Sequence, residues 1–456
     1  MQGLPVGPGS RVSQVWPRER EGADLSCESP LHADVLVIGG GMAGAMAALA
    51  ARAVQARVVL VRRAKGATAL SSGAVGVAPD VWAAQREPFA SRLTTMAAAR
   101  RVAASRSEHP YAVVGGALEG LEDALAFAAA ELAELFAPPQ EHPSVLATPY
   151  GAIVSCGLAQ RTMVEADLVA RRSLLAVVGF RGHLGFDAHL VASGLARWAE
   201  AGAPRAVAME IDLFMREDQA VARPHELARA LEVAGAAEEA GRLVRNTLPV
   251  GAEVALFPPV LGLSPSMRVM ERIAEAAGVP VAETVSDVPS VPGLRLVAAL
   301  EARLAAAGVP VISGSLSAAE PGEPAHVDGR EVCAASWVLA TGRYVGGGVV
   351  RRGRLREALL EIPVQASEAG VSGVHLAGRP AATLTFRERR LAHPLMAAGI
   401  RVDRSLRPLD AAGRPVHPRL FAAGAVIGGH DAAADGTGLG VAILTGILAG
   451  RAAAGA

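Results

Sequence analysis

A short apolar run near the N-terminus ends in a cluster of glycines, and few folds accept that combination. Residues 34–38 read DVLVI, glycines occupy positions 39, 40, 41 and 44, and residues 42–54 are rich in alanine. A β-branched run of this kind is typical of a strand buried on both faces, and alanine is the strongest helix former. A membrane helix is disfavoured, because three consecutive glycines weaken a helix and indicate a turn. The segment predicts a strand, a tight turn and a helix.

The spacing Gly39-x-Gly41-x-x-Gly44 in this context is the fingerprint of a dinucleotide-binding unit. The first glycine forms the turn, the second lets the backbone approach a pyrophosphate, and the third lets the helix pack closely on the strand. Unpaired amides at the start of the helix, which include those of Met42 and Ala43, and the positive end of the helix dipole then attract the phosphate.

The end of a second predicted strand, residues 57–61, departs from the usual pattern. Dinucleotide-binding units commonly place an acidic side chain there to bind the ribose, whereas this chain has Arg62 and Arg63. An arginine at this point either binds a 2′-phosphate or is an ordinary solvated charge, and in both cases the standard adenosine contact is missing. Ser71, Ser72 and Gly73 follow on a turn that either reaches the cofactor or forms a surface loop.

Two more strands with glycine turns lie far along the chain. Residues 419–423 predict a strand broken at Gly424, and a glycine-rich loop then leads into a helix over about 441–453, with Asp435 or Thr437 as its N-cap. Residues 337–339 predict a buried strand that ends in Ala340, Thr341 and Gly342, after a hairpin with an Asp-Gly turn. Three such elements favour a flavin over a nicotinamide alone. The residues expected against it are Gly39, Gly41, Met42, Ala43, Gly44, Arg62, Ser71, Ser72, Gly73, Ala340, Thr341, Gly342, Gly424, Gly429, Thr437, Gly438 and Leu439.

Candidates for proton chemistry are few. His430 and Asp431 follow a glycine pair at the predicted flavin edge, where they could donate a hydrogen bond or shuttle a proton. The alternative is that Asp431 caps a turn and His430 faces solvent. We interpret His109 and His189 as structural histidines. A basic cluster, Arg387, Arg389 and Arg390, either grips a substrate phosphate or forms a solvated face.

Composition excludes several classes of function. The 44 basic and 44 acidic side chains balance, which argues against nucleic-acid binding. Cys27, Cys156 and Cys333 are far apart, so we expect neither an iron-sulfur cluster nor another metal site, and an intracellular protein without a disulfide framework. Electrons must then pass through an organic cofactor or a partner. We expect no signal peptide and no transmembrane segment.

The length of 456 residues predicts more than one domain. We expect an α/β fold, a Rossmann-like doubly wound flavin-binding domain of the FAD/NAD(P)-binding type with an inserted cap or substrate domain. After a disordered extension (1–32), the flavin-binding domain is expected in three segments, 33–115, 291–345 and 396–456. The cap (116–290) separates the first two segments, and an insertion (346–395) separates the last two. The flavin is expected where the cap meets the glycine loops.

The order of the motifs resembles a known family, the flavoprotein oxidoreductases related to fumarate reductase. The similarity is closest to the B subunits of anaerobic glycerol-3-phosphate dehydrogenases. The segments that carry it are VLVIGGGMAG, ALSSGAVGV, HPYAVVG, TPYG, GFDAHL, FPPVLGL, SVPGLRL, VLATG, GIRVDRSLRP and LFAAGAVIGGHDAAADGTGLG. The glycine motifs specify only the superfamily, whereas the order and spacing of the others specify the subunit.

The resemblance implies a flavin-bearing subunit of a complex that oxidises glycerol 3-phosphate to dihydroxyacetone phosphate. It implies a catalytic A subunit, an iron-sulfur C subunit that passes electrons to menaquinone, and a cytoplasmic location on the inner face of the membrane through that partner. It also implies FMN, whereas the glycine fingerprint implies FAD, so both flavins stay open. Two other hypotheses are a self-sufficient fumarate-reductase-like dehydrogenase and a non-catalytic scaffold with a vestigial flavin fold.

Overall fold

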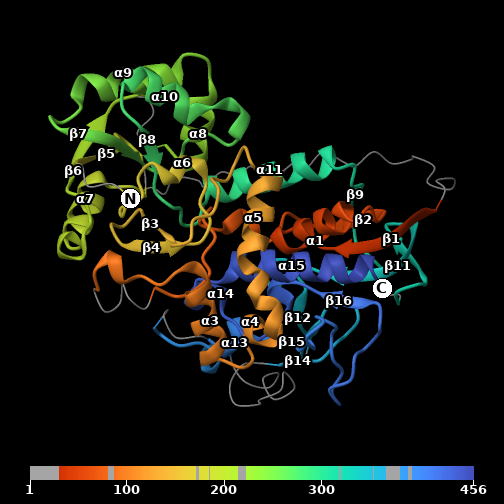
Figure 1. Cartoon of the computed structure of the whole chain (residues 1–456). Coiled ribbons are helices and arrows are strands. Elements are labelled where there is room, and N and C mark those ends of the chain that lie inside the picture. The colour runs from red at the N-terminus through yellow and green to blue at the C-terminus, as the bar shows by residue number, and fades with distance from the viewer. Residues whose placement is uncertain are drawn as a thin grey trace, which may run out of the picture.

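The computed structural model describes residues 30–80, 87–170, 174–183, 185–213, 222–317, 320–352, 354–365, 381–388 and 393–456. Two α/β units lie side by side, one at the upper left of Figure 1 and one across its centre and right. Residues 1–29 of the expected N-terminal extension lie outside the described residues, as do Cys27, Arg389 and Arg390. The first strand begins at Leu31, inside the expected extension, because Leu31 and His32 already pair with a neighbouring strand.

The central sheet of the larger unit has the strand order β10-β11-β1-β2-β9, and β16 also pairs with β11. All of its pairs are parallel except the β10–β11 hairpin. Ile38 pairs with Leu339 and with Val61, and Leu339 pairs with Ala422, so four strands end at one edge. The strands are β1 (Leu31–Ile38), β2 (Val58–Arg62), β9 (Val311–Ser313), β10 (Pro324–Val327), β11 (Arg330–Leu339) and β16 (Leu420–Ala422).

The smaller unit is a four-stranded parallel sheet in the order β6-β5-β7-β8. Alternate residues of β5 pack into opposite cores, Val178 on one face and Val177 on the other. Helices therefore cover both faces, which is the architecture of a doubly covered α/β sheet. Its elements are β5 (Leu174–Phe180), α7 (Ala188–Ala196), β6 (Ala206–Ile211), α8 (Pro224–Glu232), α9 (Ala236–Thr247), β7 (Ala252–Phe257), α10 (Val269–Ala277) and β8 (Val281–Glu283).

Further short elements lie outside these two sheets. They are α3 (Thr95–Ser105), α4 (Pro110–Val113), β3 (Ser144–Ala147), β4 (Ile153–Cys156), α6 (Arg161–Val164), β12 (Val349–Arg352), β13 (Arg354–Glu357), β14 (Val364–Gln365), α13 (Pro394–Ala397), β15 (Gly399–Ile400) and α14 (Ala432–Asp435). Helix α5 (Leu121–Glu131) differs from the boundary expected at residue 116, because its Leu121 and Leu125 pack in the core of the larger unit. No helix of the described residues is both long and apolar enough to cross a bilayer.

The first and last helices of the fold lie side by side across the larger sheet (Figure 1). They are α1 (Met42–Ala53) and α15 (Gly438–Ala454), and α11 (Val291–Ala306) packs beside α1. A Cβ atom at Gly446 would lie 2.5 Å from the Ala43 carbonyl oxygen, and one at Gly450 would lie 2.2 Å from that of Ala47. Only glycine allows the two backbones to approach this closely.

We predict that Gly450→Ala lowers the free energy of unfolding by about 1–3 kcal/mol, because the added methyl group meets the α1 backbone. The measurement is urea denaturation followed by circular dichroism. The control is Gly116→Ala, since a Cβ atom there meets nothing within 4 Å. A Gly450→Ala protein as stable as this control would contradict the packing of α1 on α15.

Candidate functional site

The turn after β1 has the conformation that its glycines predict. Gly39 has φ 126°, and a Cβ atom there would lie 2.1 Å from the Ala340 carbonyl oxygen. A Cβ atom at Gly44 would lie 1.9 Å from the Gly39 carbonyl oxygen and 3.3 Å from the Ala340 side chain. Gly41 is the N-cap residue of α1. The first and third glycines are therefore required by close contacts, and Ala340, at the end of β11, is one of the groups they contact.

One amide at the start of α1 bonds to a side chain that the sequence did not indicate. The Thr68 hydroxyl oxygen accepts a hydrogen bond from the Met42 amide at 2.9 Å, and Thr68 is buried. The segment that carries it, η1 (Ala67–Leu70), also places the Ser71 hydroxyl on the Thr68 carbonyl oxygen at 2.8 Å. The chain thus supplies its own hydroxyl to one amide of the predicted phosphate cradle.

The two arginines after β2 both have partners within the chain. Arg62 forms an ion pair with Glu301 of α11 at 2.6 Å. Its side chain also lies against the glycine turn, since a Cβ atom at Gly40 would be 2.6 Å from the Arg62 Cδ. Arg63 donates to the carbonyl oxygens of Gly346 and Gly347 at 3.3 and 3.4 Å. Arg62 is therefore an ion-paired arginine against the glycine turn and not a simple solvated charge.

The turn at Ser71, Ser72 and Gly73 joins the two units rather than forming a free surface loop. The Ser71 carbonyl oxygen accepts from the Ser290 hydroxyl at 2.5 Å, and the Gly73 carbonyl oxygen accepts from the Gln160 amide at 3.2 Å. The Ser72 hydroxyl donates to the Ala74 carbonyl oxygen at 3.3 Å. Gly73 has φ 88°, and a Cβ atom there would lie 2.3 Å from the Pro292 side chain.

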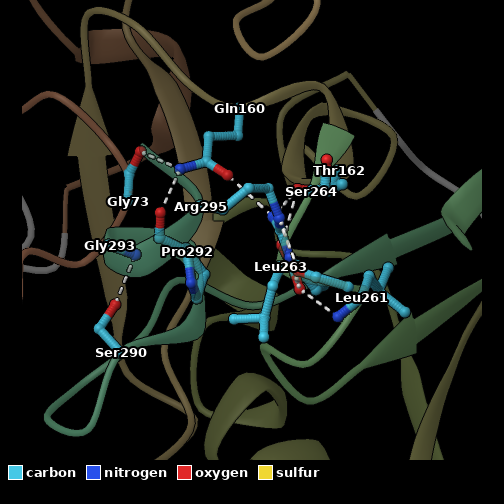
Figure 2. A network of polar contacts seen from close by, with 12 residues as sticks. Gly73, Gln160, Thr162, Leu261, Leu263, Ser264, Ser290, Pro292, Gly293 and Arg295 are labelled. Atoms are coloured by element: carbon cyan, nitrogen blue, oxygen red, sulfur yellow. Dashed lines mark hydrogen bonds and ion pairs between the residues drawn. The ribbon is translucent and has the colours of Figure 1, made fainter. Parts of the chain in front are cut away.

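A buried arginine lies at the centre of this junction (Figure 2). Arg295 of α11 donates to the Gln160 side chain at 2.8 Å, to the Glu283 carboxylate at 2.5 Å and to the Gly262 carbonyl oxygen at 2.9 Å. The Arg295 and Glu283 side chains are 1% and 0% exposed. The Glu283 carboxylate also accepts from the Leu261 amide at 2.9 Å. Nothing in the sequence indicated this network, because an arginine in a helix gives no signal of a partner that is distant along the chain.

The turn after β16 carries the two residues predicted for proton chemistry. Asp431 caps α14, and its carboxylate accepts from the amides of Ala433, Ala434 and His393. His430 is fully buried, so the alternative that it faces solvent is wrong. Its two ring nitrogens have no hydrogen-bond partner of good geometry among the described residues; burial lowers the pKa of His430, and a backbone contact with Gly428 acts in the opposite direction. A Cβ atom at Gly429 would lie 1.9 Å from the Glu108 carbonyl oxygen, which explains the glycine before His430.

A buried polar cluster includes His430, and we call it the histidine cluster: His109, Tyr111, His430 and Thr437. The ring centroids of His109 and His430 are 5.7 Å apart, and the His109 Nε2 lies 3.3 Å from the Thr437 Oγ1. All four residues are 0% exposed. Burial lowers the pKa of His109 to about 3 and, with the Arg343 charge, holds the pKa of His430 well below its usual range. Both imidazoles are therefore neutral.

The sequence left two candidates for the N-cap of α15, Asp435 and Thr437, and Thr437 occupies that position. Thr437 is the N-cap residue, yet its side chain makes no capping hydrogen bond. Asp435 ends α14, and its carboxylate accepts from Arg106 at 2.7 Å and from the Asp431 amide at 2.8 Å. Burial raises the pKa of Asp435. Gly438 and Leu439 begin α15, as the prediction of amides at this end requires.

Arg343 follows Ala340, Thr341 and Gly342, and no sequence pattern indicated a function for it. It donates to the carbonyl oxygens of His430 and Ile427 at 3.2 and 3.1 Å, so the β11 and β16 turns are bonded together. Burial lowers the pKa of Arg343 to about 10, and the guanidinium stays charged at neutral pH. The Thr341 hydroxyl is buried without a partner among the described residues.

The described residues fit a flavin in two respects. The first and third glycines of the fingerprint let the start of α1 pack tightly against the ends of β1 and β11, and the histidine cluster holds buried polar atoms without hydrogen-bond partners among the described residues. When bound, a flavin would supply two-electron redox chemistry at this edge. No group of three or more metal-binding side chains occurs in the part of the chain that the structure describes.

These features together define a nucleotide-cofactor oxidoreductase fold with its site at the carboxyl edge of a parallel sheet. The chain belongs to the FAD binding domain family, whose model matches residues 34–441. The predicted flavin-binding fold and the predicted family resemblance are thereby confirmed.

The curated relatives match the chain almost from end to end. The probable B subunit of the anaerobic glycerol-3-phosphate dehydrogenase of Halobacterium salinarum is 30% identical, and the match covers 93% of this chain and 98% of the relative. The corresponding B subunit of Pectobacterium carotovorum is 28% identical over 90% of this chain and 96% of the relative. A solved 3-ketosteroid Δ1-dehydrogenase from Sterolibacterium denitrificans matches over 93% of this chain and 99% of its own, at 12% identity and a TM-score of 0.41.

We predict that Arg295→Met lowers the free energy of unfolding by about 3–5 kcal/mol, because it leaves the Glu283 carboxylate buried without its cation. Urea denaturation measures the change. The matched control is Arg242→Met, which breaks an ion pair whose side chains are 58% and 48% exposed and should cost less than about 1 kcal/mol. Equal effects of the two substitutions would contradict the role of the buried pair.

We also predict that stability falls as the pH drops below about 6.5, the usual histidine pKa. His109 has a folded-state pKa of about 3, so between these values the unfolded chain binds more protons than the folded one. The part of the free energy of unfolding that depends on the protonation of His109 is therefore complete above about pH 6.5 and is lost toward about pH 3. Urea denaturation at about pH 6 and pH 5 measures how steeply the free energy of unfolding changes with pH. This slope should be lower by roughly 1 kcal/mol per pH unit in His109→Asn than in the parent. Unchanged slopes would show that His109 is not neutral and buried.

Proposed function

We propose that this chain is the flavin-bearing subunit of an anaerobic glycerol-3-phosphate dehydrogenase, which oxidises glycerol 3-phosphate to dihydroxyacetone phosphate. The observation that carries the proposal is the end-to-end match to relatives of that name, at up to 30% identity. The close glycine contacts at the start of α1 and the buried polar atoms of the histidine cluster support a cofactor site at this sheet edge. A secondary alcohol becomes a ketone in this reaction, so two electrons and two protons leave the substrate.

The proposed partners are a catalytic A subunit and an iron-sulfur C subunit that passes electrons to menaquinone. Attachment to the inner face of the cell membrane would come from that partner. Cys156 and Cys333 are free, and Cys156 is buried. The electron route therefore requires a group from outside the described residues of this chain. A dehydrogenase subunit that passes its electrons to partner subunits meets this requirement.

We propose His430 as the residue that contacts the cofactor or the reacting atoms. Its ring is buried, neutral and without a hydrogen-bond partner among the described residues, and Arg343 holds its backbone. Asp431 supports His430 by fixing the loop, since its carboxylate binds three backbone amides. A neutral imidazole can donate one hydrogen bond and accept another, which suits proton transfer at a redox ring.

The cofactor proposal is FMN rather than FAD. Arg62 lies over Gly40 and is paired with Glu301, and Arg63 binds the 346–347 backbone, so the place of the usual ribose-binding acid is taken by ion-paired and bonded arginines. These contacts leave less space for an adenosine at the end of β2 than the glycine fingerprint alone suggests.

The decisive experiment is anaerobic mixing of the purified full chain with glycerol 3-phosphate, with and without the co-expressed A subunit, while flavin absorbance is followed. Bleaching only with the A subunit supports the proposal. Bleaching by the chain alone would instead support a self-sufficient dehydrogenase. A chain that takes up neither FMN nor FAD would contradict the proposal and support a scaffold.

We predict that the charge swap Arg62→Glu with Glu301→Arg raises the affinity for FAD relative to FMN by roughly tenfold, because it places a carboxylate after β2 while keeping the ion pair. Fluorescence titration of each flavin measures the ratio. The matched control is Arg57→Glu with Asp34→Arg, which swaps an exposed pair away from this edge. A ratio that is the same in the swap and the control would contradict the assignment of Arg62 to the adenosine side.

A further inference from the structure

We propose that His109 is a positioning residue that fixes the Thr437 hydroxyl so that it donates a hydrogen bond to the pyrimidine edge of the bound flavin. The inference rests on the proposed function and assigns a role to a histidine that the sequence alone presents as structural. It is carried by the contacts of His109, by the orphaned proton of Thr437 and by a second buried hydroxyl at the same helix end.

The orientation of His109 is set by its own helix. His109 is the N-cap residue of α4, and its Nδ1 accepts a hydrogen bond from the Tyr111 amide at 3.1 Å. The ring is neutral, since burial and the Arg106 charge lower its pKa to about 3. A neutral imidazole that accepts at Nδ1 carries its proton on Nε2. Nε2 is therefore the donor in the 3.3 Å contact with the Thr437 Oγ1.

The same contact determines what Thr437 can do. Its oxygen accepts from His109, and the hydroxyl makes no capping bond to its own helix. The hydroxyl proton has no acceptor among the described residues, although Thr437 is 0% exposed. A buried donor without an acceptor is costly unless a ligand supplies one. Thr437 is thus held as a donor.

The helix end at Thr437 presents further donors. Helix α15 has 17 residues, and its first-turn amides have no partner within the helix. The Tyr111 hydroxyl is buried without a partner among the described residues, and it lies 2.5 Å from where a Cβ atom at Gly440 would be, against this first turn. The helix dipole adds about half a positive charge. These donors and the helix dipole suit a ligand whose edge carries hydrogen-bond acceptors and becomes negatively charged, as the pyrimidine edge of a flavin does on reduction.

The expected effect is on the reduced flavin more than on the oxidised one. A hydroxyl that is polarised by a donor to its oxygen is a stronger donor itself. Loss of the His109 contact would leave the hydroxyl free to rotate, so the negative charge of the reduced ring would be less stabilised and the midpoint potential would become more negative.

Two substitutions at His109 separate its two contacts. His109→Asn keeps an acceptor near the Nδ1 position, so it retains the cap on Tyr111 and loses the donor to Thr437. His109→Gln places a donor near the Nε2 position and loses the cap. We use the full chain reconstituted with FMN and, separately, with FAD, and measure midpoint potentials by anaerobic reductive titration.

We expect a more negative potential and roughly two- to tenfold weaker binding of reduced flavin in His109→Asn, and a potential closer to that of the parent in His109→Gln, whose folding stability falls instead. Thr437→Val should lower the potential as well, and His109→Asn should then add nothing further. Thr437→Ser keeps the hydroxyl. In that background, His109→Asn should again make the midpoint potential more negative.

Two results would overturn the inference. One is a midpoint potential of His109→Asn equal to that of the parent while the potential of Thr437→Val is shifted. The other is a double variant, His109→Asn with Thr437→Val, whose shift equals the sum of the two single shifts. Failure of the proposed function looks different, because the parent chain would then bind neither flavin, or its bound flavin would not be reduced by glycerol 3-phosphate in the presence of the A subunit.

Discussion

The close contact between the first and last helices is the constraint on which the rest of the site depends. Gly446 and Gly450 let α15 touch the backbone of α1, and this contact places the starts of α1 and α15 together at one sheet edge. The same edge receives Ala340 from β11, which contacts Gly39 and Gly44. A glycine fingerprint alone would give only a phosphate cradle. The packing of α15 adds the histidine cluster, because Thr437 at the start of this helix contacts His109.

The buried pair of Arg295 and Glu283 has a different function in the architecture. A buried ion pair adds little net stability over an apolar pair of the same size, but it tolerates few alternative arrangements. Here its hydrogen bonds reach Gln160, and through it Gly73, so the smaller unit is held against the turn that follows η1. The pair therefore specifies how the two units are docked, next to the predicted cofactor edge.

The parts of the fold that follow local signals could be predicted from sequence, and those that depend on distant partners could not. The Asp328-Gly329 hairpin and the Gly39 turn formed as expected, because a positive φ and a close approach leave little choice of residue. The capping role of Asp431 was one of two alternatives. The partner of Arg62 is 239 residues away, and no local pattern indicates it. Burial of His430 could not be predicted for the same reason, since a histidine after two glycines resembles a surface loop.

The electrostatics of the histidine cluster follow mainly from burial. His109 and His430 are neutral because desolvation disfavours imidazolium, and the nearby Arg106 and Arg343 act in the same direction. Negative charge that developed at this edge would be met by Arg343 and by the start of α15, both fixed in place before any ligand binds. The imidazoles are then left to supply directed hydrogen bonds, with proton positions set by neighbours such as the Tyr111 amide. Because both histidine pKa values lie well below neutral pH, this pattern of donors stays constant over the physiological range.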